Sequence, residues 1–338
     1  MAYITLNKKH FFNNLNIIAQ RSYGKDKIAL VLKDNAYGHG LRETAIMAQE
    51  YGISKAVVRS YDEAKEIEDF FEYILILVDT PKQCSAKFRY TLNDLHAIKK
   101  FPKGTKVELK VNTGMNRNGI EMDELREAFQ AIERQGLVLE AVFTHHSSAD
   151  EDEAVFAEQN ENFARVRAET TTLQKEYALS PLRFHSCNSA ALFQTENFSE
   201  DMARVGIAAY GCLELPQSKE AQKLKPVLSL YAKRISSRRL REGACVGYGA
   251  SYKAEQECRV SNYDFGYGDG FLRSCSHQYI TPESKELLGR ISMDNSSFLA
   301  DDEELLIFND ARVVAKSAGT ISYEVLTALK ERLPRKLV

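Results

Sequence analysis

The sequence predicts an α/β fold, in which a (β/α)8 TIM-type barrel is followed by a C-terminal, mostly antiparallel β domain. Three observations lead to this fold class. Short apolar runs alternate with amphipathic stretches up to Gly211, polar residues gather at the carboxyl ends of those runs, and beyond Gly211 short alternating segments are separated by glycines. A chain of 338 residues is also longer than one ordinary domain.

The expected strands of the barrel are eight short apolar runs, at 27–33, 55–60, 73–79, 89–96, 106–112, 139–145, 182–188 and 203–211. Amphipathic stretches lie between most of them. In one, Leu125, Phe129 and Ile132 recur at helical spacing before Gly136 ends the helix. Strands that alternate with helices form βαβ units and a parallel sheet. Eight such repeats in about 210 residues fit a closed barrel better than an open doubly wound sheet.

Most of these runs end in a polar side chain, namely Lys33, Arg59, Asp79, Asn112, His145 or Asn188. The carboxyl ends of barrel strands share one face of the barrel, where active sites are built. Polar residues without a common role would be spread more evenly along the runs. We therefore expect the reaction site at that face.

The expected barrel spans residues 9–221, and the expected β domain spans 222–338. A polar connector bounded by prolines, at 215–226, marks the boundary. The segment AYITLN at 2–7 has the character of a strand, but it has no place among the eight strands of the barrel. We expect this N-terminal strand to join the β domain.

Bulk composition narrows the class of protein. The net charge of −2 leaves no basic footprint for nucleic acid or an anionic membrane. The six cysteines are scattered without zinc-ligand spacing, so we expect free thiols in a reducing compartment and no metal site. The N-terminus lacks a signal-peptide core, and no apolar run approaches the ~18 residues of a membrane span. These features predict a soluble, cytoplasmic protein.

The stretch VLKDNAYGHG at 31–40 has more polar groups and glycines than the end of a strand requires. Lys33 is followed by further polar side chains and by two glycines that permit tight turns. A lone lysine after an apolar run is usually a surface residue whose stem covers apolar groups. A desolvated lysine at the mouth of a barrel has instead a lowered pKa and forms a Schiff base. The residues alone leave both interpretations open.

The stretch KDNAYGHG resembles the lysine motif of the alanine racemases, which are pyridoxal-phosphate enzymes of fold type III with a (β/α)8 barrel and a β domain. Further stretches resemble motifs of that family in the same order: LKVNTGMNRNGI (109–120), THHSSAD (144–150), HSCNSA (185–190), RVGIAAYG (204–211), VGYGASY (246–252), FGYGDGF (265–271), GRISMDN (289–295) and TISYE (320–324). The resemblance implies an enzyme that interconverts L-alanine and D-alanine with pyridoxal 5'-phosphate and supplies D-alanine for peptidoglycan.

The resemblance also implies how the cofactor is held. Lys33 carries it as an internal aldimine, and Arg204 faces the pyridine nitrogen. Because arginine has only donors and stays charged, that nitrogen must accept and remain unprotonated. His185 hydrogen-bonds Arg204, and Asn188 and His145 contribute further contacts. The residues that match phosphate contacts supply hydroxyl and main-chain donors suited to a dianion; they are Tyr37, Ser189, Gly206, Ile207 and Tyr323.

Racemisation requires acid–base groups on both faces of Cα. By the resemblance, Lys33 serves the D-enantiomer and Tyr248 serves the L-enantiomer. A tyrosine has an ordinary pKa of about 10, so it needs help as a base near neutral pH. His145 matches its hydrogen-bond partner, and the nearby Arg204 can favour the charged form. In the family this tyrosine comes from the other subunit, which implies a head-to-tail homodimer with shared active sites.

Further positions match substrate contacts and their supports. Arg117 matches the arginine that binds the substrate carboxylate, for which a planar donor fork is suited. Met293 matches a carboxylate contact from the partner subunit, and the neighbouring Asp294 is taken as a support. Tyr267 and Tyr323 match a narrow gate. Lys110 matches a lysine that is carbamylated in some members, where the carbamate holds Arg117.

Three positions depart from the family pattern. Asp34 stands where a small alanine is usual, His146 stands where an aromatic residue is common, and Asn116 interrupts the GMxR motif. The expected C-terminal domain is also short. The proposed catalytic pair stays intact, but the pocket's size and its selectivity are open.

Three alternative functions remain at this point. A racemase of the same family that prefers serine would differ by only a few pocket atoms, and a methyl against a hydroxymethyl is a small discrimination. A non-catalytic pyridoxal-phosphate carrier of the single-barrel kind would lack both the second domain and the opposing tyrosine. A decarboxylase of related fold fits the VGYGASY motif less well.

Overall fold

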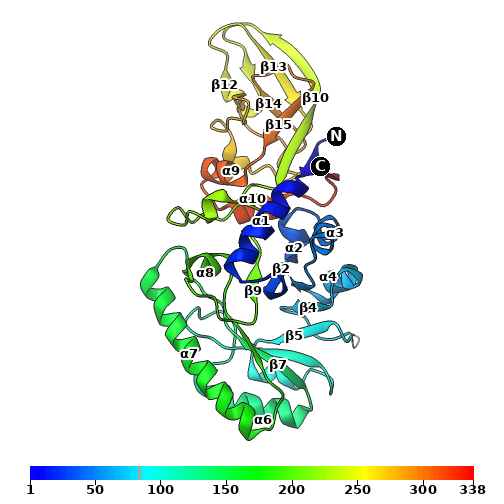
Figure 1. Cartoon of the computed structure of the whole chain (residues 1–338). Helices are drawn as coiled ribbons and strands as arrows, with labels where there is room; N and C mark the ends of the chain where they lie inside the picture. Colours follow the sequence, from blue (N-terminus) through cyan, green and yellow to red (C-terminus); the bar gives the residue numbers. More distant parts are fainter. Residues whose placement is uncertain (83–84) are drawn as a thin grey trace.

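Eight parallel strands form the barrel in the computed structural model, which describes residues 1–82 and 85–338 (Figure 1). The sheet order is β8-β7-β6-β5-β4-β3-β2-β9. The strands are β2 (Ile28–Val31), β3 (Lys55–Val58), β4 (Tyr73–Ile76), β5 (Phe88–Leu92), β6 (Lys106–Lys110), β7 (Val138–Phe143), β8 (Arg183–His185) and β9 (Ala203–Val205). All eight runs expected as strands contribute one strand each, and the predicted α/β barrel is confirmed.

The barrel closes without a continuous ladder between β8 and β9. Within the described chain, two backbone hydrogen bonds bridge this seam, from Arg204 N–H to the Cys187 carbonyl (2.9 Å) and from Asp201 N–H to the Phe184 carbonyl (3.1 Å). The inner strands are apolar runs because helices cover one face and the barrel interior the other; all four residues of β2 and of β4 are buried.

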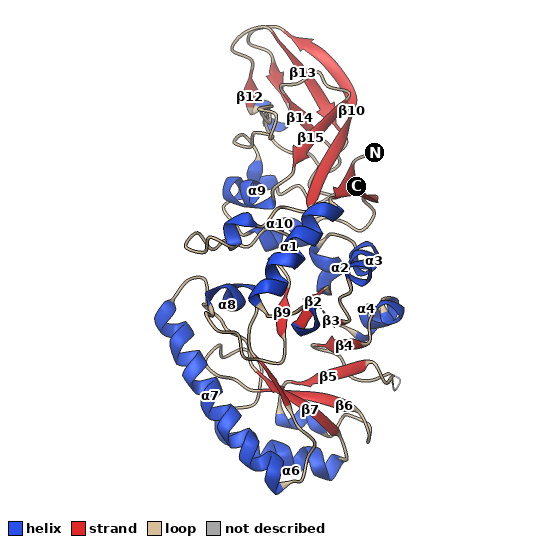
Figure 2. Ribbon diagram, in the orientation of Figure 1, coloured by secondary structure: helices blue, strands red, loops and turns tan. Residues whose placement is uncertain are grey.

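Helical segments surround the barrel strands. They are α1 (Lys8–Arg21), α2 (Lys33–Tyr37), α3 (Leu41–Tyr51), α4 (Tyr61–Glu66), α5 (Leu95–Ile98), α6 (Leu125–Gln135), α7 (Glu153–Glu176) and α8 (Ser189–Gln194). The short α2 among them is a left-handed turn rather than an α-helix. Asn7 caps α1 by accepting from His10 N–H at 2.9 Å. Gly136 ends α6 in the left-handed region, with φ 67°, as the sequence predicted. The long α7 runs along the outer edge of the barrel (Figure 2).

A second, six-stranded sheet lies beyond the barrel (Figures 1 and 2). Its strands are β14 (Ser296–Phe298), β13 (Cys258–Tyr263), β10 (Leu228–Leu240), β1 (Tyr3–Leu6), β16 (Arg335–Leu337) and β15 (Glu304–Phe308). All pairings in this sheet are antiparallel except that of β1 with β16. A mostly antiparallel C-terminal domain is thus confirmed. The first strand of the chain, β1, lies in this sheet between β10 and β16.

The rest of the C-terminal half consists of short elements. These include the hairpin of β11 (Cys245–Val246) with β12 (Tyr252–Lys253), the 3-10 turns η5 (Tyr248–Ala250) and η6 (Arg273–Cys275), and the helices α9 (Ala311–Ala318) and α10 (Ser322–Ala328). Helix α10 packs against α2, which follows the first barrel strand. The C-terminal half therefore touches the barrel at the loop that carries Lys33.

Three further findings concern residues 1–82 and 85–338. None of their helices has both the length and the apolar character needed to cross a membrane. They contain no cluster of three His, Cys, Asp or Glu side chains arranged to hold a metal ion. The cysteines in this part have free thiols; they are Cys187, Cys212, Cys245, Cys258 and Cys275. Cys84, the sixth, lies outside the described residues.

Candidate active site

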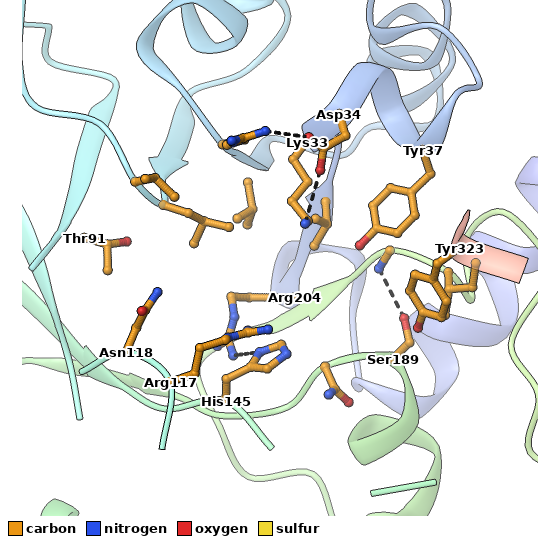
Figure 3. A pocket seen from close by; sticks show the side chains of 18 of the residues that line it. Lys33, Asp34, Tyr37, Thr91, Arg117, Asn118, His145, Ser189, Arg204 and Tyr323 are labelled. Carbon is orange, nitrogen blue, oxygen red and sulfur yellow. Dashed lines mark hydrogen bonds and ion pairs between the residues drawn. The ribbon is translucent and has the colours of Figure 1, made fainter. Parts of the chain in front are cut away.

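A cavity of about 610 Å³ opens at the carboxyl ends of the barrel strands. Most of the residues that the sequence predicted for the site line it, namely Lys33, Tyr37, Lys110, Arg117, His145, Asn188, Ser189, Arg204, Gly206, Ile207 and Tyr323. Figure 3 shows the Lys33 amine pointing into this space from one side, with Arg117, His145 and Arg204 on the other. The cavity thus joins residues that are far apart in the chain.

Lys33 stands at the start of a turn with unusual backbone geometry. The four residues that follow it, Asp34 to Tyr37, have φ between 51° and 55°, the left-handed region. For residues other than glycine this conformation costs roughly 1–2 kcal/mol each. Hydrogen bonds hold the turn: Ala36 N–H donates to the Leu32 carbonyl (2.8 Å), and Leu41 N–H donates to Asn35 Oδ1 (2.7 Å). Strain of this kind is stored where a functional side chain must be aimed.

The C-terminal half supports the same turn. Gly38 has φ 74°, and a Cβ at this position would lie 2.0 Å from the carbonyl oxygen of Leu326 in α10. Arg335 donates from Nε and Nη2 to the Gly38 carbonyl, at 3.1 and 2.9 Å. His39 is buried, stacks on the Tyr210 ring (4.3 Å between centroids) and donates from Nδ1 to the Tyr37 carbonyl. His39 and Gly38 are therefore structural parts of the turn.

Asp34 contacts the site lysine directly. Its Oδ2 lies 3.2 Å from Lys33 Nζ, and its Oδ1 lies 3.4 Å from Arg59 Nη1. Its own N–H donates to Glu63 Oε1 at 2.7 Å. The Asp34 side chain is about one-third exposed (34%), so solvent screens these ion pairs. The sequence singled out Asp34 as a departure but offered no role; the structure places it as the ion-pair partner of Lys33.

A group of donors lies where Ser189 meets the segment 206–208. Ser189 Oγ accepts from Gly206 N–H (3.1 Å) and Ala208 N–H (3.3 Å), which leaves its own hydrogen free for an acceptor. A Cβ on Gly206 would lie 2.7 Å from Tyr37 Oη, so a larger residue would displace that hydroxyl. The Tyr37 ring packs against Tyr323 of α10 at 5.8 Å.

Arg204 is buried, with 5% exposure, and its two terminal nitrogens are fully engaged. Nη1 donates to the ring Nδ1 (2.5 Å) and the carbonyl (3.2 Å) of His185. Nη2 donates to the carbonyls of Thr144 (2.6 Å) and Ser186 (3.0 Å) and to His145 Nδ1 (3.3 Å). Among the described residues, its Nε–H has no hydrogen-bond partner, so a donor remains on a side chain that lines the cavity.

Two cationic groups share the far side of the cavity. Lys110 is buried, with 8% exposure, and has no carboxylate partner among the described residues. Burial, then the charges of Arg204 and Arg117, lower the pKa of Lys110 to about 8. The guanidinium of Arg117 is exposed and makes no hydrogen bond or ion pair within the described chain. Burial, then Arg204, also holds the pKa of His145 well below its usual value, so its ring is a neutral donor–acceptor near pH 7.

Four predicted residues lie away from this cavity, on the surface of the C-terminal half. Tyr248, Tyr267 and Met293 are 69%, 41% and 55% exposed, and Asp294 is exposed as well. Their loops adjoin one another: Tyr267 N–H donates to the Ser292 carbonyl (3.0 Å), and a Cβ on Gly249, next to Tyr248, would lie 3.2 Å from Arg290 Nη1. A single chain therefore does not bring Tyr248 to Lys33.

His185 is fully buried, and its Nδ1 contacts Arg204. The supporting role predicted for His185 needs no access to the cavity. His146 also faces away from the cavity: its Nε2 lies 3.1 Å from Asn160 Oδ1, and its ring meets the edge of Phe156. The third departure, Asn116, accepts from Asn112 Nδ2 at 2.9 Å and adopts φ 54°. These contacts make His146 and Asn116 structural.

Several residues of the site were missed from the sequence. Thr91, Asn93 and Asn118 line the cavity, and the Thr91 hydroxyl is buried without a partner in the described chain. Glu108, below Lys110 on β6, hydrogen-bonds His185. The run KVELKVN contains the signal for Glu108, since a carboxylate between apolar residues of an inner strand must face a partner inside the barrel.

Together, the barrel, the lysine at its mouth and the surrounding hydrogen-bond donors form a cavity suited to a small anionic molecule, at the face of the barrel where enzymes of this fold have their active sites. The family model described as "Alanine racemase, N-terminal domain" matches residues 6–214, and "Alanine racemase, C-terminal domain" matches residues 227–337. The chain belongs to the alanine racemase family, and it is an isomerase of that kind.

The relatives below match this chain over nearly its full length. An alanine racemase of a Nitratiruptor species is 44% identical over 335 residues, which are 99% of each chain. Among solved structures, an alanine racemase of Clostridium difficile 630 is 25% identical, with a TM-score of 0.89 over 100% of this chain and 95% of that one. One from Bartonella henselae, described "with covalently bound pyridoxal phosphate", shares the fold at 23% identity, with a TM-score of 0.84 over 100% of this chain and 99% of that one.

Proposed function

We propose that this chain is a pyridoxal 5'-phosphate-dependent alanine racemase, which interconverts L-alanine and D-alanine with two acid–base groups. The observation that carries the proposal is that one cavity holds both the Lys33 amine and an Arg204 whose Nε–H lacks a partner within the described residues. A lysine amine binds an aldehyde covalently, and a guanidinium N–H is the donor that an unprotonated ring nitrogen needs. Membership of the family supports alanine as the substrate.

The remaining residues of the cavity fit this cofactor. The free hydroxyl hydrogen of Ser189 and the space that Gly206 leaves beside Tyr37 suit a phosphate group. We assign the phosphate to Tyr37, Ser189, Gly206, Ile207 and Tyr323, and further contacts to Asn188 and His145. The Thr91 hydroxyl, which has no partner among the described residues, is a polar atom that a bound molecule would satisfy.

When bound, the cofactor withdraws electrons from the Cα of an attached amino acid and so makes its hydrogen acidic. We assign to Lys33 Nζ the transfer of that proton on the face of the D-enantiomer. Tyr248 of the partner subunit would transfer it on the opposite face, for the L-enantiomer. Arg204 restrains the chemistry, because its guanidinium donates a hydrogen bond but keeps its proton, so the ring nitrogen stays unprotonated. That restraint favours simple proton exchange over other reactions at Cα.

The substrate carboxylate needs a cation, and we assign Arg117, whose guanidinium is exposed and unpaired within the described chain. Lys110 is the support we assign to Arg117, as a carbamate. From the partner subunit, Met293 would contact the carboxylate, Tyr267 would narrow the entrance with Tyr323, and Asp294 would support that loop.

We further propose a head-to-tail homodimer with shared active sites. The exposure of Tyr248, Tyr267 and Met293 on one surface of the chain supports it, because large side chains exposed together mark an interface. We place the enzyme in the cytoplasm, supplying D-alanine for bacterial peptidoglycan; the free thiols support a reducing compartment.

A panel of L-amino acids tests the proposal. Purified protein with added pyridoxal phosphate is incubated with each amino acid, and the products are separated by chiral chromatography. We expect L-alanine to approach an equal mixture of enantiomers, and faster turnover of L-serine would assign a different specificity. Lys33→Ala should lose both the visible absorbance of bound cofactor and turnover; retained turnover would contradict the assignment of Lys33.

A further inference from the structure

A carboxylate that touches neither substrate nor cofactor in the proposed reaction lies inside the barrel. Glu108 is fully buried on β6, two residues before Lys110, which lines the cavity. Its Oε1 accepts from Tyr73 Oη (2.6 Å) and Arg183 Nη2 (2.8 Å), and its Oε2 accepts from His185 Nε2 (2.8 Å). Burial raises the pKa of Glu108, but the hydrogen bond from His185 and the charge of Arg183 lower it overall. Glu108 is therefore an anion that only accepts.

His185 connects this anion to Arg204. Burial lowers the pKa of His185 to about 4, despite the opposing effect of Glu108, so the ring is neutral near pH 7 and carries one hydrogen. An ionised Glu108 requires that hydrogen on Nε2. Nδ1 then keeps its lone pair and accepts from Arg204 Nη1, at 2.5 Å. In the other tautomer, Nδ1 would carry the hydrogen, and this N–H would face an N–H of Arg204, so two donors would meet.

No carboxylate touches Arg204 directly in the described chain. Two buried carboxylates balance the charge of Arg204 indirectly, each through one intervening residue. Glu200 does so through Ser186, whose N–H donates to Glu200 Oε2 at 2.6 Å and whose carbonyl accepts from Arg204 at 3.0 Å. Glu108 does so through the His185 ring. The backbone N–H and carbonyl of Ser186 have fixed roles as donor and acceptor, whereas an imidazole has two tautomers. Only the path through His185 therefore needs an outside group to decide which nitrogen carries the hydrogen.

We propose that Glu108 is a positioning residue for Arg204: by holding the hydrogen of His185 on Nε2, it fixes the acceptor that orients the guanidinium and leaves Arg204 Nε–H available to the ring nitrogen of the cofactor. The inference rests on the proposed function in one respect, since the cofactor is what Arg204 serves. The state of His185 itself is a property of the protein alone.

Glu108→Gln tests this chain of hydrogen bonds because it keeps the shape and removes the charge. If the amide NH2 takes the place of Oε2, it faces His185 Nε2 and drives the hydrogen to Nδ1. If the NH2 takes the place of Oε1, it faces a donor of Arg183. A guanidinium has only donors and cannot relieve the second clash, whereas His185 relieves the first by moving its hydrogen. We therefore expect the variant to settle in the first orientation.

Glu140→Gln is the matched control. Glu140 accepts from Arg183 Nη2 (3.0 Å) and from Arg89 Nε (2.9 Å), so it belongs to the same charged cluster, but it has no contact with His185. Both variants remove one negative charge next to Arg183. Only Glu108→Gln changes the partner of the imidazole.

The experiment records long-range proton–nitrogen NMR spectra of protein labelled with 15N-histidine, without and with pyridoxal phosphate, and assigns His185 with a His185→Asn variant. Cofactor affinity is measured by titration of the visible absorbance. We expect an Nε2–H tautomer in the wild type and in Glu140→Gln, and loss of that single tautomer in Glu108→Gln. The dissociation constant of the cofactor should rise roughly tenfold or more in Glu108→Gln and little in Glu140→Gln.

Two results would overturn the inference. One is an Nδ1–H tautomer of His185 in the wild type, a measurement that stands even if Glu108→Gln does not fold. The other is a folded Glu108→Gln that keeps the Nε2–H tautomer or loses no more cofactor affinity than Glu140→Gln. A wild-type protein that binds no pyridoxal phosphate would instead refute the proposed function, and the spectra of the protein alone would still decide the role of Glu108 in orienting His185.

Discussion

Lys33 Nζ and Asp34 Oδ2 lie 3.2 Å apart, so the amine proposed to bind the cofactor is held by the side chain of the next residue. Arg59 competes for the same carboxylate at 3.4 Å. The contact depends on the left-handed turn, because in extended backbone consecutive side chains point to opposite sides. An ion pair of this kind must break before the amine can form a covalent bond.

Asp34→Ala should therefore speed the capture of pyridoxal phosphate by the cofactor-free protein. Exposed ion pairs are worth about 0.2–1 kcal/mol, which corresponds to a rate increase of roughly 1.5- to 5-fold. Stopped-flow absorbance measures this rate. Arg59→Ala is the control with the opposite sign, since without Arg59 the carboxylate is left to Lys33 alone. Slower capture by Asp34→Ala would contradict the interpretation.

Lys110 should carry a carbamate. A buried amine whose pKa is lowered to about 8 by burial and by Arg204 and Arg117 is partly neutral near pH 7, and carbon dioxide adds only to the neutral form. The product is an anion, which the two guanidinium groups stabilise. Native mass spectrometry in bicarbonate should detect one added carbon dioxide, lost in Lys110→Met. Absence of this adduct at every bicarbonate concentration would contradict the carbamate.

His146→Phe should make the protein more resistant to acid. Burial lowers the pKa of His146 to about 4, whereas in the unfolded chain it is near 6.5. Between these pH values the unfolded state binds more protons, so stability falls as the pH falls from 6.5 to 4. A phenylalanine removes this proton linkage and fits the packing against Phe156. Urea unfolding of the cofactor-free protein at pH 5 and pH 8 measures the difference, which should shrink by about 1–2 kcal/mol. An unchanged difference would assign the acid sensitivity to other groups.

Gly38→Ala should destabilise the protein and abolish cofactor binding. The new Cβ would lie 2.0 Å from the Leu326 carbonyl oxygen, so either the turn or α10 must move. Gly319→Ala is the matched control, because Gly319 has nearly the same φ (70° against 74°) but nothing within 4 Å of the added atom. We expect about 1 kcal/mol for Gly319→Ala and at least ~3 kcal/mol for Gly38→Ala in chemical denaturation. Equal losses would mean that the contact with α10 relaxes freely.

Mixing Lys33→Ala with Tyr248→Phe protein should restore activity if Tyr248 acts in the partner's cavity. Each variant alone lacks one group at every site. A mixed dimer has one site with both defects and one site with neither, so random exchange of subunits restores about a quarter of wild-type activity. Turnover is measured after co-refolding of the two variants. Activity no higher than that of the separate proteins would refute the shared site. Tyr248→Phe alone should also suppress proton exchange from L-alanine more than from D-alanine.

The sequence is most informative where physical chemistry acts locally. The barrel followed from apolar runs such as 73–79 and from polar residues such as His145 at their carboxyl ends, because burial on both faces and the common direction of parallel strands constrain those patterns. The resemblance to the alanine racemases identified most of the predicted site residues that line the cavity, including Lys33 and Arg204.

What escaped prediction depends on long-range contacts. The left-handed turn after Lys33 could not be read from Asp34 to Tyr37, since none is a glycine and the contacts that hold the turn include Arg335. The role proposed for Glu108 depends on its contact with His185 in β8 and, through that ring, on Arg204 in β9. The exposure of Tyr248 is visible only once the chain has folded, because a motif identifies a residue but not the cavity it enters.

The hydrogen bonds from Arg335 to the Gly38 carbonyl can form only late in translation. These two residues are 297 positions apart, and at ordinary rates of translation the second leaves the ribosome roughly 15–60 s after the first. Until then, β1 also lacks its parallel neighbour β16. A nascent chain can thus complete much of its barrel while the turn beside Lys33 is still unfinished. Completion of the turn that follows Lys33 is then a late event in biosynthesis, and truncation near residue 335 would remove a contact that holds this turn.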